Sequence, residues 1–363
     1  MRNDTGFDEM STKIAGQARN DEEYIMTIFV TGAAGYIATH VILELYKQGY
    51  DVVAADNFSN SKPEAITRTR ALAGTDFPCY EMDIRDTDEL AKIFKTHNIE
   101  CVIHLAGLKA VGESVEKPLT YYANNLDSTI SLLNAMKQHN IRNLIFSSSA
   151  TVYSGDNEMP LTEDSKTGNC TNPYGWTKYM CEIIISDFVH ANKDFSAALL
   201  RYFNPIGADI SGDIGEDPSD IPNNLMPYIA QTAVGRRPFL SVFGNDYDTP
   251  DGTGVRDYIH VADLASGHVA SIKYLETHKG INTFNLGTGK GISVLELVEA
   301  FESASGVKIK QKITDRRPGD LAVSYASTKK AERELGWTAK KTLLEACADS
   351  WRWQSKNPNG YEG

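Results

Sequence analysis

Tyr174 and Lys178 have the side-chain types and the spacing to remove a proton from an alcohol. Residues four positions apart lie on the same face of a helix, one turn from each other. A free tyrosine hydroxyl has a pKa of about 10 and is a poor base at neutral pH, whereas a neighbouring ammonium favours the phenolate. Such a pair takes the proton of a hydroxyl group while another group removes the hydride. The alternative is that Tyr174 packs on the helix and Lys178 is a solvated charge.

The sequence around this pair predicts a helix and a strand that leads to it. Asn172 is a typical N-cap, and Pro173 is tolerated at the first helical position. Upstream, the apolar run 143–147 predicts a strand that continues into Ser147-Ser-Ser-Ala-Thr151. The ends of parallel strands deliver their loops to one crevice, so these hydroxyl groups are expected there. The helix is continued by an apolar stripe at Met180, Ile183, Ile184 and Phe188.

The composition is that of an ordinary globular protein and argues against several kinds of partner. The 363 residues can hold two domains, and 41% of them are apolar and 23% charged. No run of about eighteen apolar residues occurs, so no membrane span is predicted. The net charge of −12 argues against a nucleic-acid partner, although a small anionic ligand needs only local positive charge.

The cysteines and the first 25 residues give no sign of a binding site. The cysteines have no metal-like spacing, so no metal site is predicted and reduced thiols in the cytosol are expected. Residues 1–25 are polar and lack the apolar core of a signal peptide, so we expect a disordered extension. The five cysteines are Cys79, Cys101, Cys170, Cys181 and Cys347.

A strand, a glycine turn and a helix follow this extension. The run 27–31 is short, apolar and β-branched, as in a buried parallel strand. Gly32 permits a tight turn, and Gly35 lets the backbone approach a pyrophosphate at the N-terminus of a helix that stops at Gly49. The third small position of this dinucleotide fingerprint is Ala38, which helix–strand packing tolerates. An ordinary βα turn is the alternative interpretation.

The next predicted strand ends at Asp56, which favours NAD as the cofactor. A carboxylate there accepts hydrogen bonds from a ribose diol and repels a 2′-phosphate, so NAD is favoured over NADP. Later strands deliver their ends to the same crevice. A surface acid is the less favoured alternative for Asp83, and His104 is expected in the core. The candidate cofactor contacts at these ends are Asp83, Leu105, Ala106, Gly107, Lys109 and Asn124.

Longer motifs run through almost the whole chain. In the first half they are Gly32-x-x-Gly35, Asp56-Asn57-x-x-Asn60-Ser61, the segment 104–114, Ser147-Ser-Ser-Ala-Thr-Val-Tyr153 and Tyr174-x-x-x-Lys178. In the second half they are the segments 200–205, 221–228, 243–247, 252–260 and 316–320. Together, over about residues 27 to 361, the chain resembles the UDP-glucose (UDP-galactose) 4-epimerases of the extended short-chain dehydrogenase/reductase family.

This resemblance implies roles for individual residues. Those at catalytic positions are Ser149, Tyr174 and Lys178. Those at NAD-binding positions are Gly32, Gly35, Tyr36, Ile37, Asp56, Asn57, Asn60, Ser61, Asp83, Ile84, Leu105, Ala106, Lys109, Asn124, Ser149, Tyr174, Lys178 and Phe203. Those at UDP-hexose-binding positions are Lys109, Ser149, Tyr174, Asn204, Asn224, Leu225, Ser241, Phe243, Arg256, Arg317, Asp320 and Ser324.

The residue types fit these roles. Arginine pairs bidentately with phosphate oxygens, and amides bond carbonyl, phosphate or sugar groups. Without the resemblance, Asn204 and Asn224 would be typical turn or cap residues, and Arg256 and Arg317 could equally form surface salt bridges.

The resemblance also implies a mechanism without net oxidation. Tyr174, as a phenolate stabilised by Lys178 and the nicotinamide, takes the proton of the sugar 4-hydroxyl, and Ser149 bridges that hydroxyl. The 4-hydride passes to NAD⁺, and the 4-keto sugar turns over before the hydride returns to its other face. The UDP must therefore be held firmly and the sugar loosely, and the cofactor should stay bound through many turnovers.

Ser324 is implied to tune the choice of substrate. It aligns with a position at the sugar pocket where tyrosine restricts the family to plain hexoses and smaller residues leave room for a 2-acetamido group. We therefore predict, as a hypothesis, that N-acetylated UDP-hexosamines are also epimerised. A serine at an ordinary strand end is the alternative.

Three rival functions share the fold. A sugar-nucleotide 4,6-dehydratase needs Asp-Glu after its serine or threonine, where this chain has Ala150 and Thr151. A UDP-glucuronate 4-epimerase is less easily excluded. A non-enzymatic dinucleotide sensor commonly lacks the tyrosine or the lysine, which this chain keeps together with Ser149.

We expect an α/β fold with a Rossmann-type doubly wound parallel sheet over residues 26–202 and a smaller mixed α/β UDP-sugar-binding domain over 203–363. Residues around 255–270 are expected to cross back, and the active site to lie between the lobes. The family dimerises through helices at about 121–139 and 174–190, so a cytoplasmic homodimer is expected.

Overall fold

The computed structural model of the chain describes residues 25–218, 222, 224–317 and 319–362. The extension predicted for residues 1–25 lies outside this range except for Ile25, which is exposed. No helix in the described ranges combines the length and the apolar character needed to cross a bilayer.

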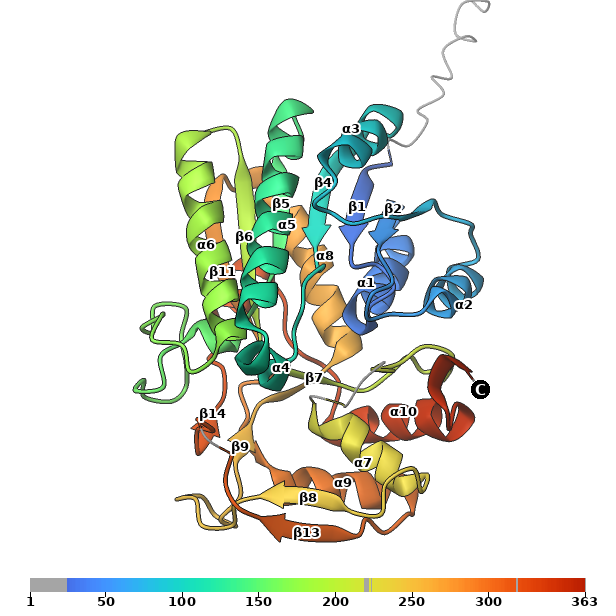
Figure 1. Cartoon of the computed structure of the whole chain (residues 1–363), viewed down its shortest axis with the longest axis vertical. Helices are drawn as coiled ribbons and strands as arrows, with labels where there is room; N and C mark the ends of the chain where they lie inside the picture. The colour runs from blue at the N-terminus through green and yellow to red at the C-terminus, as the bar shows by residue number, and fades with distance from the viewer. Residues whose placement is uncertain (1–24, 219–221, 223, 318, 363) are drawn as a thin grey trace, which may run out of the picture.

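A seven-stranded sheet dominates the described part of the chain, and all of its strand pairs are parallel (Figure 1). Its spatial order is β11-β6-β5-β4-β1-β2-β3, so the order reverses between β1 and β4. Ligands of such sheets bind at the carboxyl ends of the strands that flank this reversal. The strands are β1 (Thr27–Thr31), β2 (Asp51–Asp56), β3 (Cys79–Glu81), β4 (Ile99–His104), β5 (Asn143–Ser149), β6 (Ser196–Tyr202) and β11 (Gly280–Leu286).

Helices cover both faces of the sheet, which explains why its strands are continuously apolar. One core cluster joins the sheet to α1 (Tyr36–Lys47), α2 (Pro63–Ala73) and α8 (Val261–Thr277). The other joins it to α3 (Thr87–Thr96), α5 (Pro118–Gln138) and α6 (Pro173–Ala191). The predicted Rossmann-type doubly wound fold is therefore confirmed.

A smaller lobe lies beyond the carboxyl edge of the sheet (Figure 1). Its own core packs α7 (Leu225–Ala233), α9 (Val294–Ser305) and α10 (Leu343–Lys356) against β8 (Leu240–Phe243), which pairs with β13 (Gln311–Thr314). Short strands link the lobes, namely β7 (Asn204–Ile206), β9 (Val255–Arg256), β10 (Tyr258–His260), β12 (Ile292–Ser293) and β14 (Val323–Ser324).

The return of the chain to the sheet is longer than the segment expected around 255–270. After β10, helix α8 packs on α1, and β11 then pairs with β6 from Gly280 to Leu286. The sheet thus takes its last strand from beyond residue 202. The division at residue 202 stays a prediction for the lobes, and the contribution of 261–286 to the sheet adds to it.

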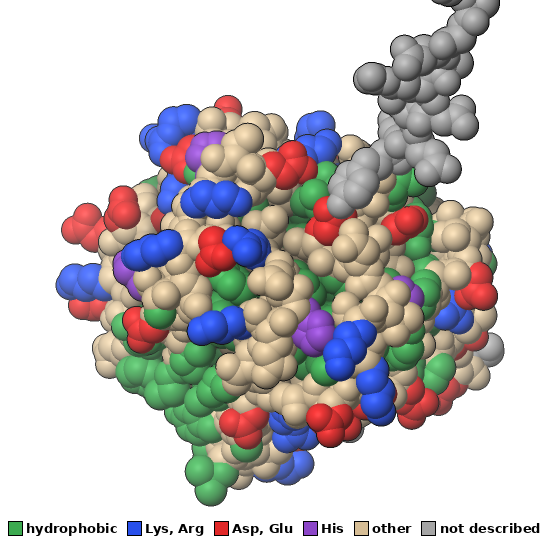
Figure 2. Space-filling view, turned by 90° about the horizontal axis from the view of Figure 1, so that it is seen from above, with side chains coloured by type: hydrophobic (Ala, Val, Ile, Leu, Met, Phe, Trp, Pro, Cys, Tyr) green, Lys and Arg blue, Asp and Glu red, His purple; other side chains and the backbone are tan. Residues whose placement is uncertain are grey.

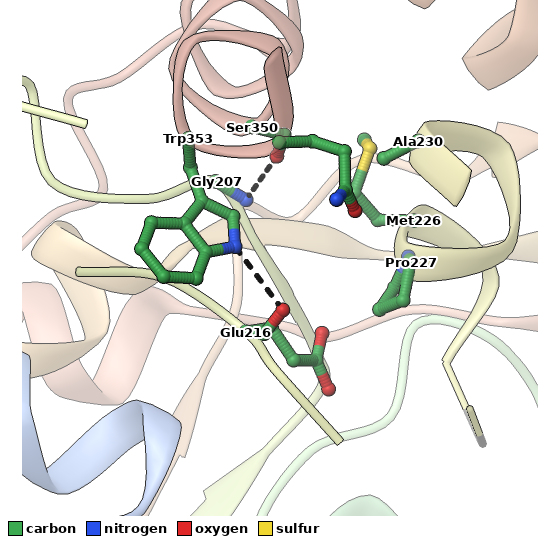
Figure 3. A pocket seen from close by; sticks show the side chains of 8 residues that line it. Gly207, Glu216, Met226, Pro227, Ala230, Ser350 and Trp353 are labelled. Atoms are coloured by element: carbon green, nitrogen blue, oxygen red, sulfur yellow. Dashed lines mark hydrogen bonds between the residues drawn. The ribbon is translucent and has the colours of Figure 1, made fainter. Parts of the chain in front are cut away.

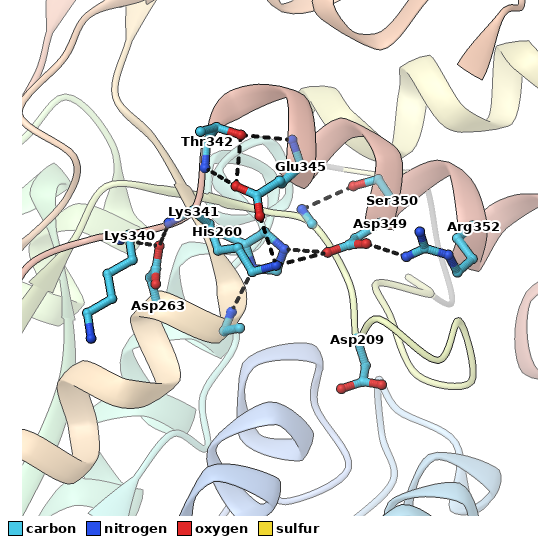
Figure 4. A network of polar contacts seen from close by, with 12 residues as sticks. Asp209, His260, Asp263, Lys340, Lys341, Thr342, Glu345, Asp349, Ser350 and Arg352 are labelled. Atoms are coloured by element: carbon cyan, nitrogen blue, oxygen red, sulfur yellow. Dashed lines mark hydrogen bonds and ion pairs between the residues drawn. The ribbon is translucent and has the colours of Figure 1, made fainter. Parts of the chain in front are cut away.

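Buried polar contacts hold this crossover in place (Figure 4). His260 accepts a hydrogen bond from the backbone N–H of Ala262 through Nδ1 at 3.0 Å, and its Nε2 lies 3.2 Å from Asp349 of α10. Asp263, in the first turn of α8, accepts the N–H groups of Lys340 and Lys341 at 2.9 and 2.8 Å. The second lobe is thereby attached to both ends of the β10–α8 junction.

Asp257, fully buried between β9 and β10, also joins segments that are distant in the sequence. Its carboxylate accepts hydrogen bonds from the N–H and hydroxyl of Thr288 at 2.8 and 2.6 Å, and from the N–H groups of Gly289 and Ala326 at 2.9 and 3.2 Å. A buried carboxylate is tolerated where its oxygens are fully hydrogen-bonded. Asp257 therefore fixes the neighbouring Arg256 and β14 relative to the first lobe.

Candidate active site

The predicted helix start at Asn172 is confirmed. The Asn172 side chain accepts a hydrogen bond from the N–H of Gly175 at 2.9 Å, and Pro173 occupies the first turn of α6. Lys178, one turn beyond Tyr174, is buried. Its ammonium donates to the carbonyl oxygen of Ser147 at 2.6 Å and lies 5.0 Å from the ring centre of Phe146. Lys178 is therefore directed at β5 and is not a solvated charge.

Ser149 ends β5 and meets Tyr174 of α6. Ser149 Oγ accepts hydrogen bonds from the N–H and the hydroxyl of Thr151 at 3.2 and 2.9 Å. Burial raises the pKa of Tyr174 to about 12, and its hydrogen bond with Ser149 lowers the pKa only in part. Among the protein's own groups, burial therefore dominates the Tyr174 pKa, and the lowering expected from Lys178 together with the nicotinamide stays a prediction.

Burial also acts on the charge of Lys178. It lowers the pKa of the ammonium to about 8, and the neighbouring Cys181 and Glu182 raise it in part. A buried lysine whose pKa lies near neutral pH gives up its proton more readily than a solvated lysine does. Ser149, Tyr174 and Lys178 thus form one cluster between β5 and α6.

The glycine turn after β1 has the form of a pyrophosphate cradle. Gly32 has φ +65°, and a Cβ at this position would lie 2.7 Å from the backbone nitrogen of Ala106. Gly35 is the N-cap of α1, whose first turn has no acidic side chain and whose cap has no side-chain hydrogen bond. The free N–H groups of this helix end suit an anion. Thr31, which sequence reasoning missed, holds the facing loop by accepting the N–H groups of Leu105 and Ala106 at 3.2 Å each.

Asp56 lies buried at the end of β2, where a ribose contact was predicted. It accepts hydrogen bonds from the N–H of Ala34 at 2.9 Å, the N–H of Phe58 at 2.8 Å and the hydroxyl of Ser61 at 2.8 Å. A carboxylate can accept about four hydrogen bonds. One further donor, such as a ribose hydroxyl, can therefore be accommodated, and these residues fit a dinucleotide.

Asn125 is a second residue that sequence reasoning missed. Buried on α5, it accepts the N–H of Leu108 at 2.8 Å and donates to the carbonyl oxygen of Leu108 at 3.0 Å and to Thr177 at 2.9 Å. It therefore ties the predicted cofactor loop to α6. Its helical spacing from the buried Tyr121 was a signal that could have placed it on the inner face.

The other predicted cofactor contacts have partners of their own. Asp83 binds Arg85 in a fork, with Nε at 2.9 Å and a terminal nitrogen at 2.6 Å, and Asn57 also hydrogen-bonds it. The Asp83 pKa is lowered, chiefly by Arg85. The side chain of Asn124 donates to Asn125 at 3.1 Å. Asn60 is exposed, whereas Ile37 packs on the first core, and Ile84 and Phe203 are buried.

Glu216 brings together two residues that were predicted to bind different parts of the ligands. Its Oε1 lies 3.4 Å from Lys109 Nζ and accepts a hydrogen bond from Asn224 at 2.8 Å. Its backbone carbonyl accepts the indole N–H of Trp353 at 3.3 Å, beside a cavity of about 10 Å³ (Figure 3). Tyr36 donates to Gly207, which also lines this cavity, at 2.7 Å.

The predicted diphosphate anchors lie together in the second lobe. Asp320 lies 3.7 Å from Arg256 and accepts a hydrogen bond from Arg317 Nε at 3.0 Å, and the Arg317 guanidinium covers the exposed ring of Phe243 at 4.7 Å. Ser324 on β14 pairs directly with Arg256 on β9. The remaining predicted contacts lie on neighbouring elements: Ser241 on β8, Leu225 at the start of α7 and Asn204 on β7.

No group of three or more His, Cys, Asp or Glu residues in the described part of the chain is arranged to hold a metal ion. A parallel sheet with a glycine cradle, an acid at the end of β2 and a Ser–Tyr–Lys cluster defines a dinucleotide-dependent enzyme of the short-chain dehydrogenase/reductase type. The chain matches the model of the NAD dependent epimerase/dehydratase family over residues 28–287. The chain belongs to this family.

Similar proteins confirm the resemblance found in the motifs. The UDP-glucose 4-epimerase of Bacillus subtilis (strain 168) is 56% identical over 337 residues, which are 93% of this chain and 99% of that protein. The human UDP-glucose 4-epimerase is 55% identical over 340 residues, which are 92% and 98% of the two chains. The crystal structure of UDP-glucose 4-epimerase from Bifidobacterium longum in complex with NAD⁺ and UDP has a TM-score of 0.90 and 53% identity, and it covers 92% of this chain and 100% of that one.

The cradle predicts the effect of adding a methyl group at Gly32. In Gly32→Ala the new Cβ would meet the backbone of Ala106, so the loop must move away from the cofactor. We expect the amount of NAD released per chain on denaturation to fall severalfold and the melting temperature to drop. Gly49→Ala is a matched control, because Gly49 has a similar φ of +80° but no atom within 4 Å of its Cβ position. It should cost about 1 kcal/mol of stability and keep the cofactor. Equal NAD contents in the two variants would contradict the role of the cradle.

Proposed function

We propose that the chain is an NAD-dependent UDP-glucose 4-epimerase that interconverts UDP-galactose and UDP-glucose through a 4-keto sugar. The observation that carries this proposal is the Ser149–Tyr174–Lys178 cluster at the carboxyl edge of the sheet, the same edge at which β1 ends in the glycine cradle of Gly32. The identity of about 55% with UDP-glucose 4-epimerases over almost the whole chain supports it.

The chain's own groups would move the proton of the sugar 4-hydroxyl. Tyr174 accepts it, and Ser149, which already bonds Tyr174, orients the hydroxyl. Lys178 lies behind the pair, where its ammonium donates to the Ser147 carbonyl, and its positive charge favours a negative tyrosine. Bound NAD supplies a reversible hydride acceptor. We assign its binding to the cradle residues, Asp56 and the loop held by Asn125.

The second lobe would hold the UDP. Arg256 and Arg317 provide charge and paired donors for a diphosphate, and Asp320 keeps both arginines together. The sugar would extend from this anchor toward Tyr174, held by fewer contacts so that it can present both faces. Firm binding at one end and loose binding at the other suits a reaction that removes and returns hydride at one carbon.

Two rival functions find less support. Elimination of water needs an acid–base pair after Ser149, but Ala150 has no polar side chain and the hydroxyl of Thr151 is bonded to Ser149. A dinucleotide sensor carries out no proton transfer and does not need a buried tyrosine and lysine beside a serine. A UDP-glucuronate 4-epimerase remains the alternative substrate choice to be tested.

Epimerase activity should be measurable without added cofactor. We expect the purified chain to convert UDP-galactose into UDP-glucose and to act on UDP-glucuronate far more slowly. Tyr174→Phe should lower kcat by roughly 10²- to 10⁴-fold, because it removes the proton acceptor. Tyr179→Phe, on the same helix, is the control and should stay near the original rate. A chain that yields no UDP-glucose, or a Tyr174→Phe variant with normal kcat, would refute the proposal.

We also propose that N-acetylated UDP-hexosamines are substrates. Ser324 is half-buried, and its pairing with Arg256 places it next to the diphosphate anchor. The segment that carries it lies against the N-terminal end of α6, where a Cβ at Gly319 would be 3.6 Å from Thr171. A small side chain at this point would leave more room beside the proposed anchor than a tyrosine would.

Enlarging Ser324 should therefore separate the two kinds of substrate. Ser324→Tyr is expected to lower kcat/KM for UDP-N-acetylgalactosamine and UDP-N-acetylglucosamine by about tenfold or more, by filling the space for the acetamido group. Its activity on UDP-galactose should change by only a few fold, and Ser324→Ala should keep both activities. If the unaltered chain converts UDP-N-acetylglucosamine no faster than Ser324→Tyr does, the hypothesis is wrong.

We further propose that the chain acts as a cytoplasmic homodimer. The five cysteines are all free thiols, which suits a reducing compartment. Exposed apolar side chains lie on α4 (Val111–Glu116), α5 and α6, with Val115 at 62%, Leu119 at 81% and Ile183 at 43% exposure. In the view from above, hydrophobic side chains gather on the side where α5 and α6 lie (Figure 2). A second copy of the chain is the partner that we propose for this surface.

Charges on this surface should separate the dimer. Leu119→Glu combined with Ile183→Glu is expected to halve the mass measured by light scattering, since burying two carboxylates in an apolar contact is costly. Leu344→Glu is the matched control, because Leu344 is exposed at 53% on α10, in the other lobe. The surface is not a dimer contact if the double variant keeps the mass of the unaltered chain, or if that chain is itself a monomer.

A further inference from the structure

A buried ion pair joins α6 to the sheet directly behind the catalytic cluster. Glu182 and Arg201 are exposed by only 5% and 6%. Glu182 Oε1 accepts Arg201 Nε at 3.0 Å, and Oε2 accepts a terminal nitrogen of Arg201 at 2.7 Å. Burying two charges is costly, and well-packed apolar residues often serve stability equally well or better. Stability alone therefore does not account for the pair.

The carboxylate of Glu182 has a third partner that connects it to the active site. Ser148, which is almost fully buried, donates its hydroxyl to Glu182 Oε1 at 2.5 Å. Ser148 directly precedes Ser149 and is paired with Arg201 across β5 and β6. Glu182 thus binds two facing residues of the sheet at the point where β5 delivers the catalytic serine.

Helix α6 and strand β5 consequently meet in three successive contacts. Tyr174, Lys178 and Glu182 follow one another at intervals of four residues, so they share one face of α6. Glu182 binds Ser148, Lys178 binds the carbonyl of Ser147, and Tyr174 bonds Ser149. Two of these contacts involve residues already assigned to the reaction, and the Glu182 contact is the remaining one.

Arg201 holds Glu182 in place and reaches a further loop. Its guanidinium donates to the carbonyl of Glu163 at 3.1 Å and covers the ring of Tyr153 at 4.8 Å. The guanidinium thus contacts Glu182, the Glu163 carbonyl and the Tyr153 ring. These contacts fix its orientation and, with it, the carboxylate of Glu182. A glutamate without this support could adopt several rotamers and would not define the position of Ser148.

We propose that Glu182, held by Arg201, is a positioning residue. Its hydrogen bond with Ser148 sets the distance between Ser149 and Tyr174. The inference rests on the proposed epimerase function. In this role Glu182 acts through Ser148 and does not contact the substrate, and neither does Arg201. Because proton transfer depends steeply on geometry, loss of the Ser148–Glu182 hydrogen bond should slow the chemical step without weakening the binding of UDP-sugar.

Ser148→Ala tests the positioning role directly, because it removes the hydrogen bond to Glu182 and leaves the Glu182–Arg201 ion pair intact. We expect kcat per NAD-loaded site to fall between about tenfold and a hundredfold, with KM changed by less than about twofold. The kinetic isotope effect with UDP-galactose deuterated at C4 should be as large as in the unaltered chain or larger. The control is Ser271→Ala, which removes a buried hydroxyl that donates to the Gly267 carbonyl at 2.8 Å within α8.

A second variant separates positioning from folding. Glu182→Met combined with Arg201→Met removes both charges of the ion pair, so neither partner stays buried without the other and the melting temperature should be close to that of the Ser271→Ala control. Its NAD content should be preserved while kcat per loaded site falls as in Ser148→Ala. If kcat per loaded site is unchanged in both variants while the unaltered chain is active, the pair is merely structural. If the unaltered chain is itself inactive on UDP-galactose, the proposed function fails instead.

Discussion

The hydrogen bond from the Lys178 ammonium to the Ser147 carbonyl is the contact on which the site depends. It joins α6 to β5 at the carboxyl edge of the sheet and gives the buried ammonium a carbonyl dipole as a partner. The requirement to satisfy this charge orients α6, and with α6 the ring of Tyr174. Burial has a second effect, since it raises the pKa of Tyr174 to about 12 and lowers that of Lys178 to about 8. The pKa values of the two groups nearly coincide in water and are therefore moved apart in the protein, so the tyrosine holds its proton more firmly than the lysine does.

The same principle organises the second lobe, where buried carboxylates take the place of the lysine. Asp257 gathers four donors from segments that are distant in sequence, and it lies next to Arg256. Because Ser324 pairs with Arg256, the predicted diphosphate anchor and the position proposed to tune the choice of sugar lie side by side. Asp257 thus fixes this part of the second lobe without being one of the predicted ligand contacts.

Local signals in the sequence predicted the elements that depend on nearby residues. Asn172 and Pro173 marked the start of α6, and Gly32 marked a turn with positive φ, because capping and backbone strain act within a few residues. The contribution of β11 to the sheet could not be predicted in this way, since it depends on pairing with β6 across about eighty residues. Asn125, Thr31 and Glu216 were missed for a related reason. Each is a polar residue whose partners come from other elements, so its role exists only once the chain is folded.

The Tyr174 pKa shows where motif reasoning reaches its limit. The spacing of tyrosine and lysine correctly places both on one face, but the sign of a pKa shift is set by burial and by the sum of surrounding charges. Here the lysine is committed to the Ser147 carbonyl, and the protein alone keeps the tyrosine neutral. A positive charge brought beside this ring by a ligand would favour the phenolate, whereas burial favours the neutral form. The geometry around Tyr174 can be read from the folded chain, but its protonation depends on everything that packs or binds beside the ring.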